Sequence, residues 1–398
     1  MATLGMTLAA GALVTPAGAH PPVVEREMPG AQARADTPCR APLAFDLAQP
    51  AQRQRLAPGT RLSVWRAQHP DATPDEVRRA RIAVIEVTPG AARVLPEAAG
   101  APLLEDPARL AQRKGTLGLV NGDYFAEWGS DGALPWGAVI ENGRAVYAPP
   151  GGSQVVAIGP NGVPRSTWVH VSATLRGARG KELASLAAVN DPLVSRGQWT
   201  VYTPDWRATR TPRARPTVVV RGGKITSVQS GRHRVRVPAD GFVVTAPAGT
   251  SLAGFRVGAK VTLDMRVSAS DGRKVAFASG HGGRSLKKGE VVAGCSRYEN
   301  ILRPRTSLAW NKEGRIWLIV VSTGLPDPPD GVRVGGATKE EVARVAQALG
   351  ATEAVDLDGG GSTALYARAQ GQVRRIDLPQ NAWVRPIPVV WSVRTPTR

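Results

Sequence analysis

The feature that most constrains this fold is a succession of short β-branched runs joined by glycine-rich turns. The run GAVIENGRAVYA has Asn142-Gly143 as its two-residue turn, and TVVVRGGKITSV has Gly222-Gly223. These dipeptides favour the turns that join antiparallel strands. The run RTSLAWNKEGRIWLIVV repeats the pattern around Gly314. Such a density of hairpins predicts antiparallel or mixed sheets.

Few segments have a helical pattern. In ATKEEVARVAQALG, Thr338 and Glu341 form a capping box, an apolar stripe follows, and Gly350 ends the helix. DPARLAQRKG, residues 106–115, predicts a shorter helix before the strand TLGLVNGDYF. Strand-rich sheets with few helices favour an α+β fold.

The net charge of +19 favours an anionic partner. The basic residues are spread in ones and twos from Arg26 to Arg398, without a long basic block, zinc-finger spacing or an RNA-binding aromatic signature. We therefore expect a phosphate-bearing polymer or an acidic surface as partner and no nucleic acid. A compositional bias toward arginine is the alternative explanation.

The N-terminus predicts export to the cell envelope or the medium. Its apolar stretch carries Ala17 and Ala19 in the arrangement of a signal-peptidase site, although a basic head is missing. A plain apolar tail is the alternative. No other window has about 18 uninterrupted apolar residues, so no membrane span is expected. We read residues 1–58 as export signal and extended arm, and residues 59–398 as the folded body.

The two cysteines, Cys39 and Cys295, are far apart in sequence and lack metal-ligand spacing. In an exported protein they could form one disulfide that ties the arm to the body. Two unpaired thiols are the alternative, because spacing does not establish proximity.

The stretch AVDLDGGGSTALY carries the strongest functional signal. In an extended strand Asp356 and Asp358 point to the same face. The segment Gly359 to Gly361 lacks side chains, so its backbone N–H groups could face a ligand, as in anion-binding loops. The alternative is a tight, bulged connection in which Asp358 makes local turn bonds.

Other motifs add candidates. LVNGDYF places Asn121, Gly122 and Asp123 at the end of an apolar strand; ASGHGGRS carries His281, and Arg305 precedes a strand. The alternative interpretations are that His281 is an incidental loop histidine and that Arg305 is a surface charge. Three carboxylates, those of Asp123, Asp356 and Asp358, could also bind calcium or magnesium, although no cofactor is required by the chemistry we expect.

Taken in order, VNGDYF, PWGAVIENG, VNDPLVSRGQWTVYTPDW, RPRTSLAWNKEGRIWLIVV, TKEEVARVAQALGA, VDLDGGGSTALY and VRPIPVVWSV resemble the phosphodiester glycosidase family over about residues 61–393. The resemblance implies that residues 59–398 form a catalytic domain that hydrolyses the glycosidic bond of a sugar 1-phosphodiester. Its partner would be a phosphorylated or anionic glycan substrate. It implies catalytic carboxylates at Asp123, Asp358 and Asp356. It implies substrate contacts from Asn121, Gly122, Asn190, His281, Gly282, Arg305, Gly359, Gly360, Gly361 and Ser362. Asp356 stands where many relatives have Asn, and Asp123 and Tyr124 depart from the usual N-G-G/T-F-F.

Two other functions stay open from the sequence. The first is a glycosidase that uses the same carboxylates on a phosphate-free extracellular polysaccharide. The second is a non-catalytic module that holds anionic wall polymers by its positive charge.

Overall fold

The computed structural model describes residues 42, 45–68, 79–128, 132–193, 197–212, 215–296, 298–323, 335–379 and 383–396. The chain from Arg34 to Arg398 forms one compact unit. The predicted signal peptide, most of the predicted arm and Cys39 lie outside the described residues, so export and the Cys39–Cys295 pairing stay predictions.

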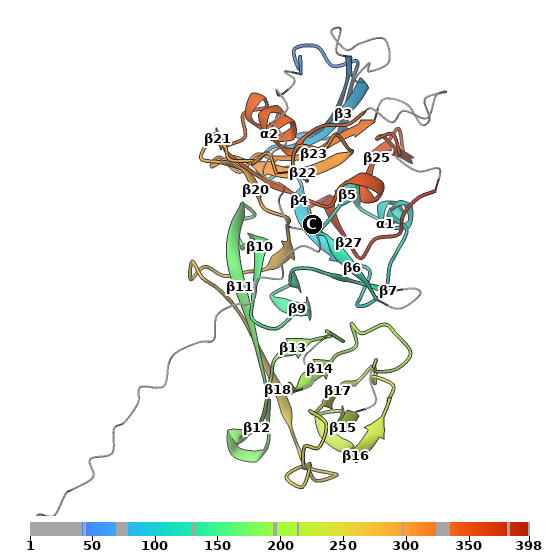
Figure 1. Ribbon diagram of the computed structural model, residues 1–398, viewed down its shortest axis with the longest axis vertical. Helices are drawn as coiled ribbons and strands as arrows, with labels where there is room; N and C mark the ends of the chain where they lie inside the picture. The colour runs from blue at the N-terminus through green and yellow to red at the C-terminus, as the bar shows by residue number, and fades with distance from the viewer. Residues whose placement is uncertain are drawn as a thin grey trace, which may run out of the picture. The chain divides into compact units, whose positions relative to one another are not determined.

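The described chain is essentially all-β, and the predicted α+β class is wrong (Figure 1). Its α-helices are α1 (Pro107–Gln112) and α2 (Lys339–Ala348). Both were predicted, and Thr338 and Glu341 form the expected capping box. The helices are short and each packs onto a sheet, whereas the hairpin turns recur along the whole chain. No helix in the described part is long and apolar enough to cross a membrane.

An eight-stranded antiparallel sheet forms one layer of the core. Its strands, in order, are β1 (Gln52–Ala57), β2 (Thr60–Gln68), β3 (Arg79–Val87), β23 (Ile316–Thr323), β22 (Arg305–Trp310), β24 (Glu353–Asp356), β20 (Arg284–Lys287) and β21 (Glu290–Val291). β1 lies inside the segment predicted to be an arm. Its sequence QRQRLA is mostly polar, so it lacks the apolar alternation by which a strand is recognised.

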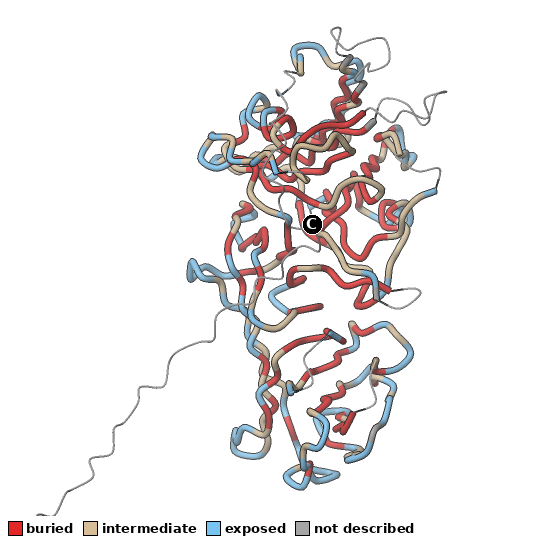
Figure 2. The backbone as a smooth tube through the Cα atoms, viewed as in Figure 1, coloured by how far each residue is buried: buried red, intermediate tan, exposed pale blue. Residues whose placement is uncertain are grey.

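A five-stranded antiparallel sheet packs against the first. Its order is β26 (Gln372–Arg375), β25 (Leu365–Ala369), β5 (Thr116–Asn121), β27 (Val389–Arg394) and β4 (Arg93–Ala98). Apolar side chains from both sheets, among them Ile85, Val120, Leu308, Val355 and Trp391, form one buried cluster between them. Figure 2 shows this burial along β3, β22 and β23. The packing brings the ends of β5 and β24 together.

The remaining strands form further sheets. A seven-stranded sheet contains β12 (Glu182–Leu186), β11 (Pro164–Arg176), β10 (Ser153–Ile158), β19 (Phe277–Gly280), β8 (Val139–Glu141) and β9 (Arg144–Tyr147), with β18 (Thr262–Ala269) beside β11. A five-stranded sheet contains β13 (Ala188–Val189), β14 (Thr200–Tyr202), β17 (Gly241–Thr245), β15 (Arg215–Arg221) and β16 (Lys224–His233). A separate hairpin joins β6 (Phe125–Trp128) to β7 (Gly132–Pro135).

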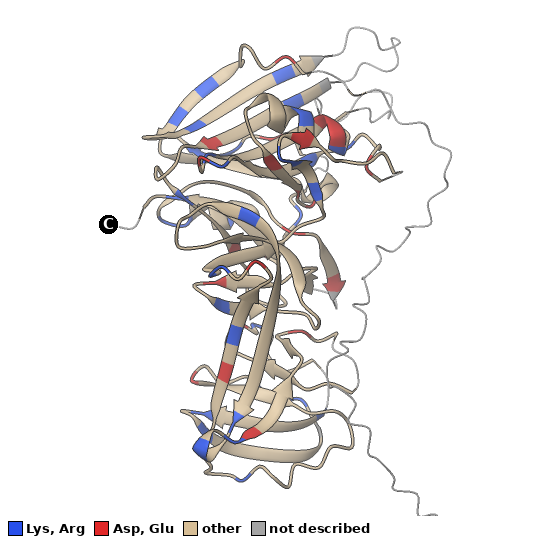
Figure 3. Cartoon of the chain, turned by 90° about the vertical axis from the view of Figure 1, so that its left-hand side faces the viewer, with Lys and Arg blue, Asp and Glu red and all other residues tan. Residues whose placement is uncertain are grey.

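The predicted hairpin turns are confirmed. Asn142 and Gly143 have φ of 52° and 75°, and Gly222 and Gly223 have 51° and 73°, the left-handed region that such turns require. Basic residues lie on strands of several sheets and do not form one block (Figure 3).

Candidate active site

Asn121 joins three chain segments at the end of β5. Its Nδ2 donates to the carbonyl of Asp358 at 2.6 Å. Its Oδ1 accepts from the Thr306 hydroxyl at 2.6 Å and from the Ala364 amide at 3.1 Å. The side chain, predicted to contact substrate, therefore braces the strand ends against each other.

Gly122 connects the same strand ends through backbone hydrogen bonds. Its carbonyl accepts from the amide of Asp358 at 3.0 Å, and its amide donates to the carbonyl of Val389 at 2.9 Å. A Cβ at this position would lie 2.8 Å from that carbonyl oxygen. Close backbone packing, and not a ligand, explains the glycine.

Asp123 carries a carboxyl group with unusual properties. It is 2% exposed; Oδ2 accepts from the Gly137 amide at 2.7 Å, while Oδ1 is buried without a hydrogen-bond partner among the described residues. Burial raises the pKa of Asp123 to about 7, with a further contribution from the charge of Asp358, against the opposing amide of Gly137. Gly280 leaves room for it, because a Cβ there would lie 2.2 Å from Oδ2. This carboxyl group can therefore exchange a proton near neutral pH.

Asp356 is the last residue of β24, and it is ion-paired. Its Oδ2 lies 3.1 Å from Nζ of Lys339 at the start of α2, and the two side chains are only 9% and 8% exposed. Burial raises the pKa of Asp356, and the lysine opposes that shift. Because one oxygen is held by Lys339, Asp356 is a weaker candidate for proton transfer than Asp123.

Asp358 lies beyond the end of β24, so the extended strand that was predicted to align it with Asp356 does not continue this far. Its Oδ1 accepts from the amide of Gly359 at 2.8 Å. Burial raises the pKa of Asp358, while a hydrogen bond from Ser362 and the charges of Arg385 and Arg303 oppose the shift. We call Asp123, Asp356 and Asp358 the acidic cluster.

The glycine segment, Gly359 to Gly361, is approached by the protein's own backbone. A Cβ at Gly359 would lie 2.9 Å from the carbonyl oxygen of Pro304, and the amide of Gly360 donates to that oxygen at 2.8 Å. Gly360 has φ of 62° and begins the short 3₁₀ turn Gly360–Ser362. Since the amides of Gly359 and Gly360 are already bonded, the segment offers fewer N–H groups to a ligand than predicted.

Arg305, predicted to hold a phosphate, is instead bonded to carbonyl groups. Nε donates to Ala337 at 3.2 Å, and Nη2 donates to Tyr298 and to Ile301, each at 2.8 Å. The residue is 7% exposed. Its guanidinium fixes the chain around residues 298–301 beside the acidic cluster.

Arg385 is the basic residue that the sequence reading missed. Nη1 donates to the hydroxyl of Ser362 at 3.2 Å, and Nη2 donates to the exposed Glu127 at 3.1 Å. The guanidinium lies over the ring of Phe125 at 4.6 Å, and the side chain is 31% exposed. The available signal was the arginine of VRPIP, just before β27, at a strand end that the fold brings to the glycine segment.

Tyr124 packs among the acidic side chains. Its ring stacks on Trp136 at 5.3 Å between centroids, and a Cβ at Gly282 would lie 2.2 Å from Cε2 of the tyrosine. Burial raises the pKa of Tyr124, and the charges of Asp356 and Asp358 add to the shift. The phenol therefore remains a proton donor. Gly282 gives space to this ring.

His281 is buried beside the site as a neutral ring. Nδ1 accepts from the amide of Gly283 at 3.1 Å, so Nε2 carries the proton and donates to Ser166 Oγ at 3.1 Å. Burial lowers the pKa of His281 to about 4. With Nε2 already protonated, the ring cannot take a proton from Ser166.

Asn190 lies in another part of the fold. It is fully buried with φ of 54°; Nδ2 donates to the carbonyl of Val146 and to the Thr203 hydroxyl, each at 2.8 Å, and Oδ1 accepts from the Thr203 amide. These bonds use the whole side-chain amide. The structure does not bring Asn190 to the acidic cluster.

The metal alternative finds no support in this geometry. No group of three or more His, Cys, Asp or Glu side chains that could hold a metal ion occurs within the described ranges. The ion pair of Asp356 with Lys339 also removes one of the three carboxylates that the alternative needs.

Residues 214–394 match the family model described as phosphodiester glycosidase. The predicted resemblance to the phosphodiester glycosidases is confirmed over this segment. It includes Asp356, Asp358, Arg305 and Arg385, while Asp123 precedes it. A comparison with curated proteins finds no match.

Two solved structures with a TM-score above 0.6 show the same fold. A protein from Synechocystis superposes with a TM-score of 0.66 at 19% identity, covering 88% of this chain and 64% of that one. A protein from Burkholderia pseudomallei described as exported gives a TM-score of 0.63 at 19% identity, covering 79% and 74%. The catalytic domain of zebrafish N-acetylglucosamine-1-phosphodiester alpha-N-acetylglucosaminidase, auto-inhibited by its pro-peptide, gives 0.44 at 15% identity, covering 87% of each chain. The chain thus spans less than two thirds of the Synechocystis protein.

Proposed function

We propose that this protein is a hydrolase that cleaves the glycosidic bond of a sugar 1-phosphodiester. The products are the free sugar and a phosphate monoester on the acceptor. The observation that carries the proposal is the convergence of Asp123, Asp358 and Arg385 at the glycine segment, which lies in the part of the chain that matches the phosphodiester glycosidases.

The leaving group sets the demand on the site. A phosphate monoester has a second pKa of about 6 and departs readily, so binding its oxygens matters more than protonating them. Arg385 suits this task, because its partly exposed guanidinium reaches Ser362 beside the glycine segment and its other partner, Glu127, is exposed. Arg305 is assigned no contact with the phosphate, because its hydrogen bonds go to backbone carbonyl groups. It positions the chain beside the acidic cluster.

The carboxyl groups would support the reacting carbon and the attacking water. Asp358, held by the amide of Gly359, would stabilise positive charge at the anomeric carbon. Above about pH 7 Asp123 is ionised and could take the proton of water through Oδ1, which has no hydrogen-bond partner among the described residues. Water then attacks the anomeric carbon, and the bond to the phosphate oxygen breaks with its electron pair left on that oxygen.

We further propose that the protein works outside the cytoplasm. The support is the apolar N-terminal stretch with Ala17 and Ala19. One structural neighbour is described as exported. Detection of the mature chain in the culture medium or envelope fraction, with cleavage after Ala19, would test this.

The activity is tested by incubating the purified protein with a panel of sugar 1-phosphodiesters and following free sugar by NMR. We expect Asp358→Asn to lower kcat/KM by about a thousandfold and Arg385→Ala by about tenfold to a hundredfold. Arg221→Ala is the matched control, because Arg221 is exposed on β15 and pairs with Asp240.

Neutral glycosides separate this proposal from its rivals. If Arg385→Ala leaves hydrolysis of phosphodiesters unchanged, or if neutral glycosides are cleaved equally well, the phosphate role is wrong. If no substrate of the panel is hydrolysed while salt-sensitive binding of anionic polymers survives Asp358→Asn, the protein is a binding module.

A further inference from the structure

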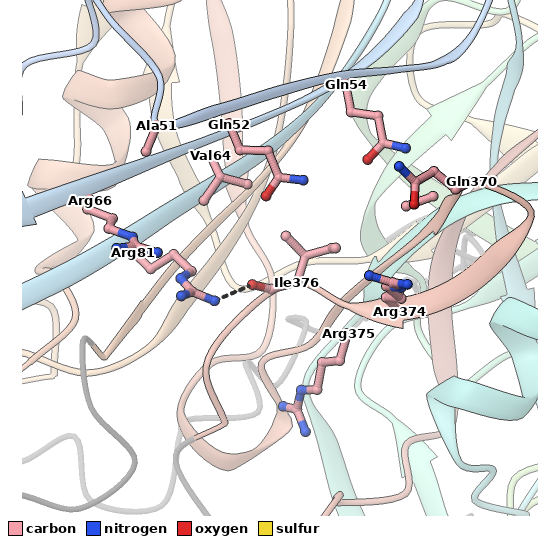
Figure 4. Close-up of a pocket in the computed structure, with 11 residues that line it drawn as sticks. Ala51, Gln52, Gln54, Val64, Arg66, Arg81, Gln370, Arg374, Arg375 and Ile376 are labelled. Atoms are coloured by element: carbon pink, nitrogen blue, oxygen red, sulfur yellow. Dashed lines mark hydrogen bonds between the residues drawn. The ribbon is translucent and has the colours of Figure 1, made fainter.

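A cavity of about 330 Å³ lies between the sheet edge formed by β1, β2 and β3 and the strand β26 (Figure 4). Four arginines line it: Arg66, Arg81, Arg374 and Arg375. We call it the arginine pocket. It is separate from the acidic cluster, none of whose three carboxylates lines it.

Arg66 and Arg81 face each other directly. They are cross-strand partners in the antiparallel pairing of β2 with β3, a position in which like charges destabilise a sheet. Burial lowers the pKa of Arg81, and the neighbouring charge of Arg66 lowers it further, against an opposing effect of Asp377. An anion bound between the two guanidinium groups would relieve this repulsion.

Arg81 also has unused hydrogen-bonding capacity. Nη1 donates to the carbonyl of Ile376 at 3.2 Å, which links β3 to the end of β26 (Figure 4). Nε is buried and has no partner within the described residues. A buried guanidinium N–H without an acceptor is costly, so an acceptor in the cavity would satisfy it.

Acidic residues are absent from the described lining of the pocket. The nearby Asp377 is already bonded to Arg375, with Nη2 to Oδ2 at 2.9 Å. Arg375 points away from the glutamines in Figure 4, and its Nη2 also donates to the carbonyl of Thr363 at 3.0 Å. Arg66, Arg81 and Arg374 therefore lack an acidic partner lining the pocket.

The other polar wall is made of amides. Gln52, Gln54 and Gln370 line the same cavity, and Figure 4 shows their amide ends pointing toward its interior. A side-chain amide both donates and accepts, which suits hydroxyl groups. The volume lies at the lower end of the range for small-molecule sites, enough for a phosphate joined to one small polyol or sugar.

We propose that the arginine pocket is a binding site for a phosphate group carried on a sugar or polyol. Arg66, Arg81 and Arg374 hold the phosphate oxygens, and the glutamine amides contact the hydroxyl groups. This site does not depend on the hydrolytic activity proposed above, and its ligand need not be the substrate.

Isothermal titration of the purified full chain with glucose 1-phosphate at low ionic strength tests the site, with glucose as the uncharged probe. We expect binding of glucose 1-phosphate and none of glucose. Arg66→Ala/Arg374→Ala should weaken it about tenfold or more, since charge-assisted bonds are lost. Arg53→Ala/Arg55→Ala is the matched control: it removes the same charge from β1, at positions that alternate with Gln52 and Gln54.

Asp358→Asn separates this site from the acidic cluster, because it should keep the full affinity of the arginine pocket. The proposal is overturned if glucose 1-phosphate does not bind, if glucose binds equally, or if both arginine double variants lose affinity to the same extent. Should the first double variant fail to fold, Arg374→Ala alone replaces it, because Arg374 is exposed on β26. An unchanged affinity in that variant would equally contradict the assignment.

Discussion

The acidic cluster and the arginine pocket each gather charges of one sign, and the protein handles them differently. In the acidic cluster, burial raises the pKa of Asp123 to about 7, so a proton can neutralise it, and Lys339 compensates Asp356. Arginine cannot use the first solution, because it keeps its charge at any ordinary pH. The arginine pocket also lacks the second, since its lining contains no acid among the described residues. The first region is thus suited to proton transfer, and the second to binding an anion.

The largest expected effect comes from removing the internal compensation of the acidic cluster. Lys339→Met leaves Asp356 as a buried carboxylate without its cation, which typically costs about 3–5 kcal/mol. We expect the free energy of unfolding, measured by urea titration at neutral pH, to fall by that amount. Adding Asp356→Asn should restore most of the loss, because the uncompensated charge is then gone.

Arg344→Ala is the control for that change. Arg344 lies on the same helix and pairs with Glu340 across one turn, but its side chain is 48% exposed. A solvated pair of this kind contributes about 0.3–0.5 kcal/mol. Equal losses in the Lys339 and Arg344 variants would show that the acidic cluster does not need its lysine.

The ionisation of Asp123 should have a smaller effect on the free energy of unfolding. Its pKa is raised from 3.8 to about 7 in the folded chain, so the folded state holds a proton that the unfolded state has lost. Stability therefore falls as pH rises between these two values. We expect the free energy of unfolding of Asp123→Asn, relative to the unsubstituted protein, to rise by about 2 kcal/mol between about pH 5 and pH 8.

Urea titrations across that pH range measure the difference. Glu313→Gln is the control, because Glu313 lies at an exposed turn and is 57% exposed. If the curves of Asp123→Asn and Glu313→Gln have the same pH dependence, Asp123 ionises normally and cannot be the group that titrates near neutral pH.

The sequence predicted local structure well where one residue decides it. Asn142-Gly143 demands a left-handed turn, and Thr338 with Glu341 caps α2, so both elements were found. The class was misjudged because predicted helices were given too much weight beside many hairpins. The strand β1 was missed because its stability comes from pairing with β2 and not from an apolar pattern.

The sequence indicated which segments lie together better than it indicated what their side chains contact. Asp123, Asp358 and the glycine segment do converge. Whether a polar side chain faces a ligand or the protein's own backbone is a tertiary property, and so Asn121 and Arg305 were assigned to substrate although their bonds are internal. Arg385 was overlooked for the same reason, since only packing brings it to Ser362.

The smallest expected effect has the opposite sign from the first. Arg66→Gln removes a like charge from the cross-strand pair with Arg81, so without phosphate it should stabilise the chain by about 0.5 kcal/mol. Saturating glucose 1-phosphate should cancel this advantage, because the unsubstituted protein binds the ligand more tightly and binding stabilises the folded state. Arg53 lies on β1 opposite Ser63 of β2, so Arg53→Gln should show neither effect. Thermal unfolding of each variant with and without glucose 1-phosphate measures both changes in stability. If Arg66→Gln is destabilising in both conditions, Arg66 is a structural residue and the two regions do not differ in the way proposed.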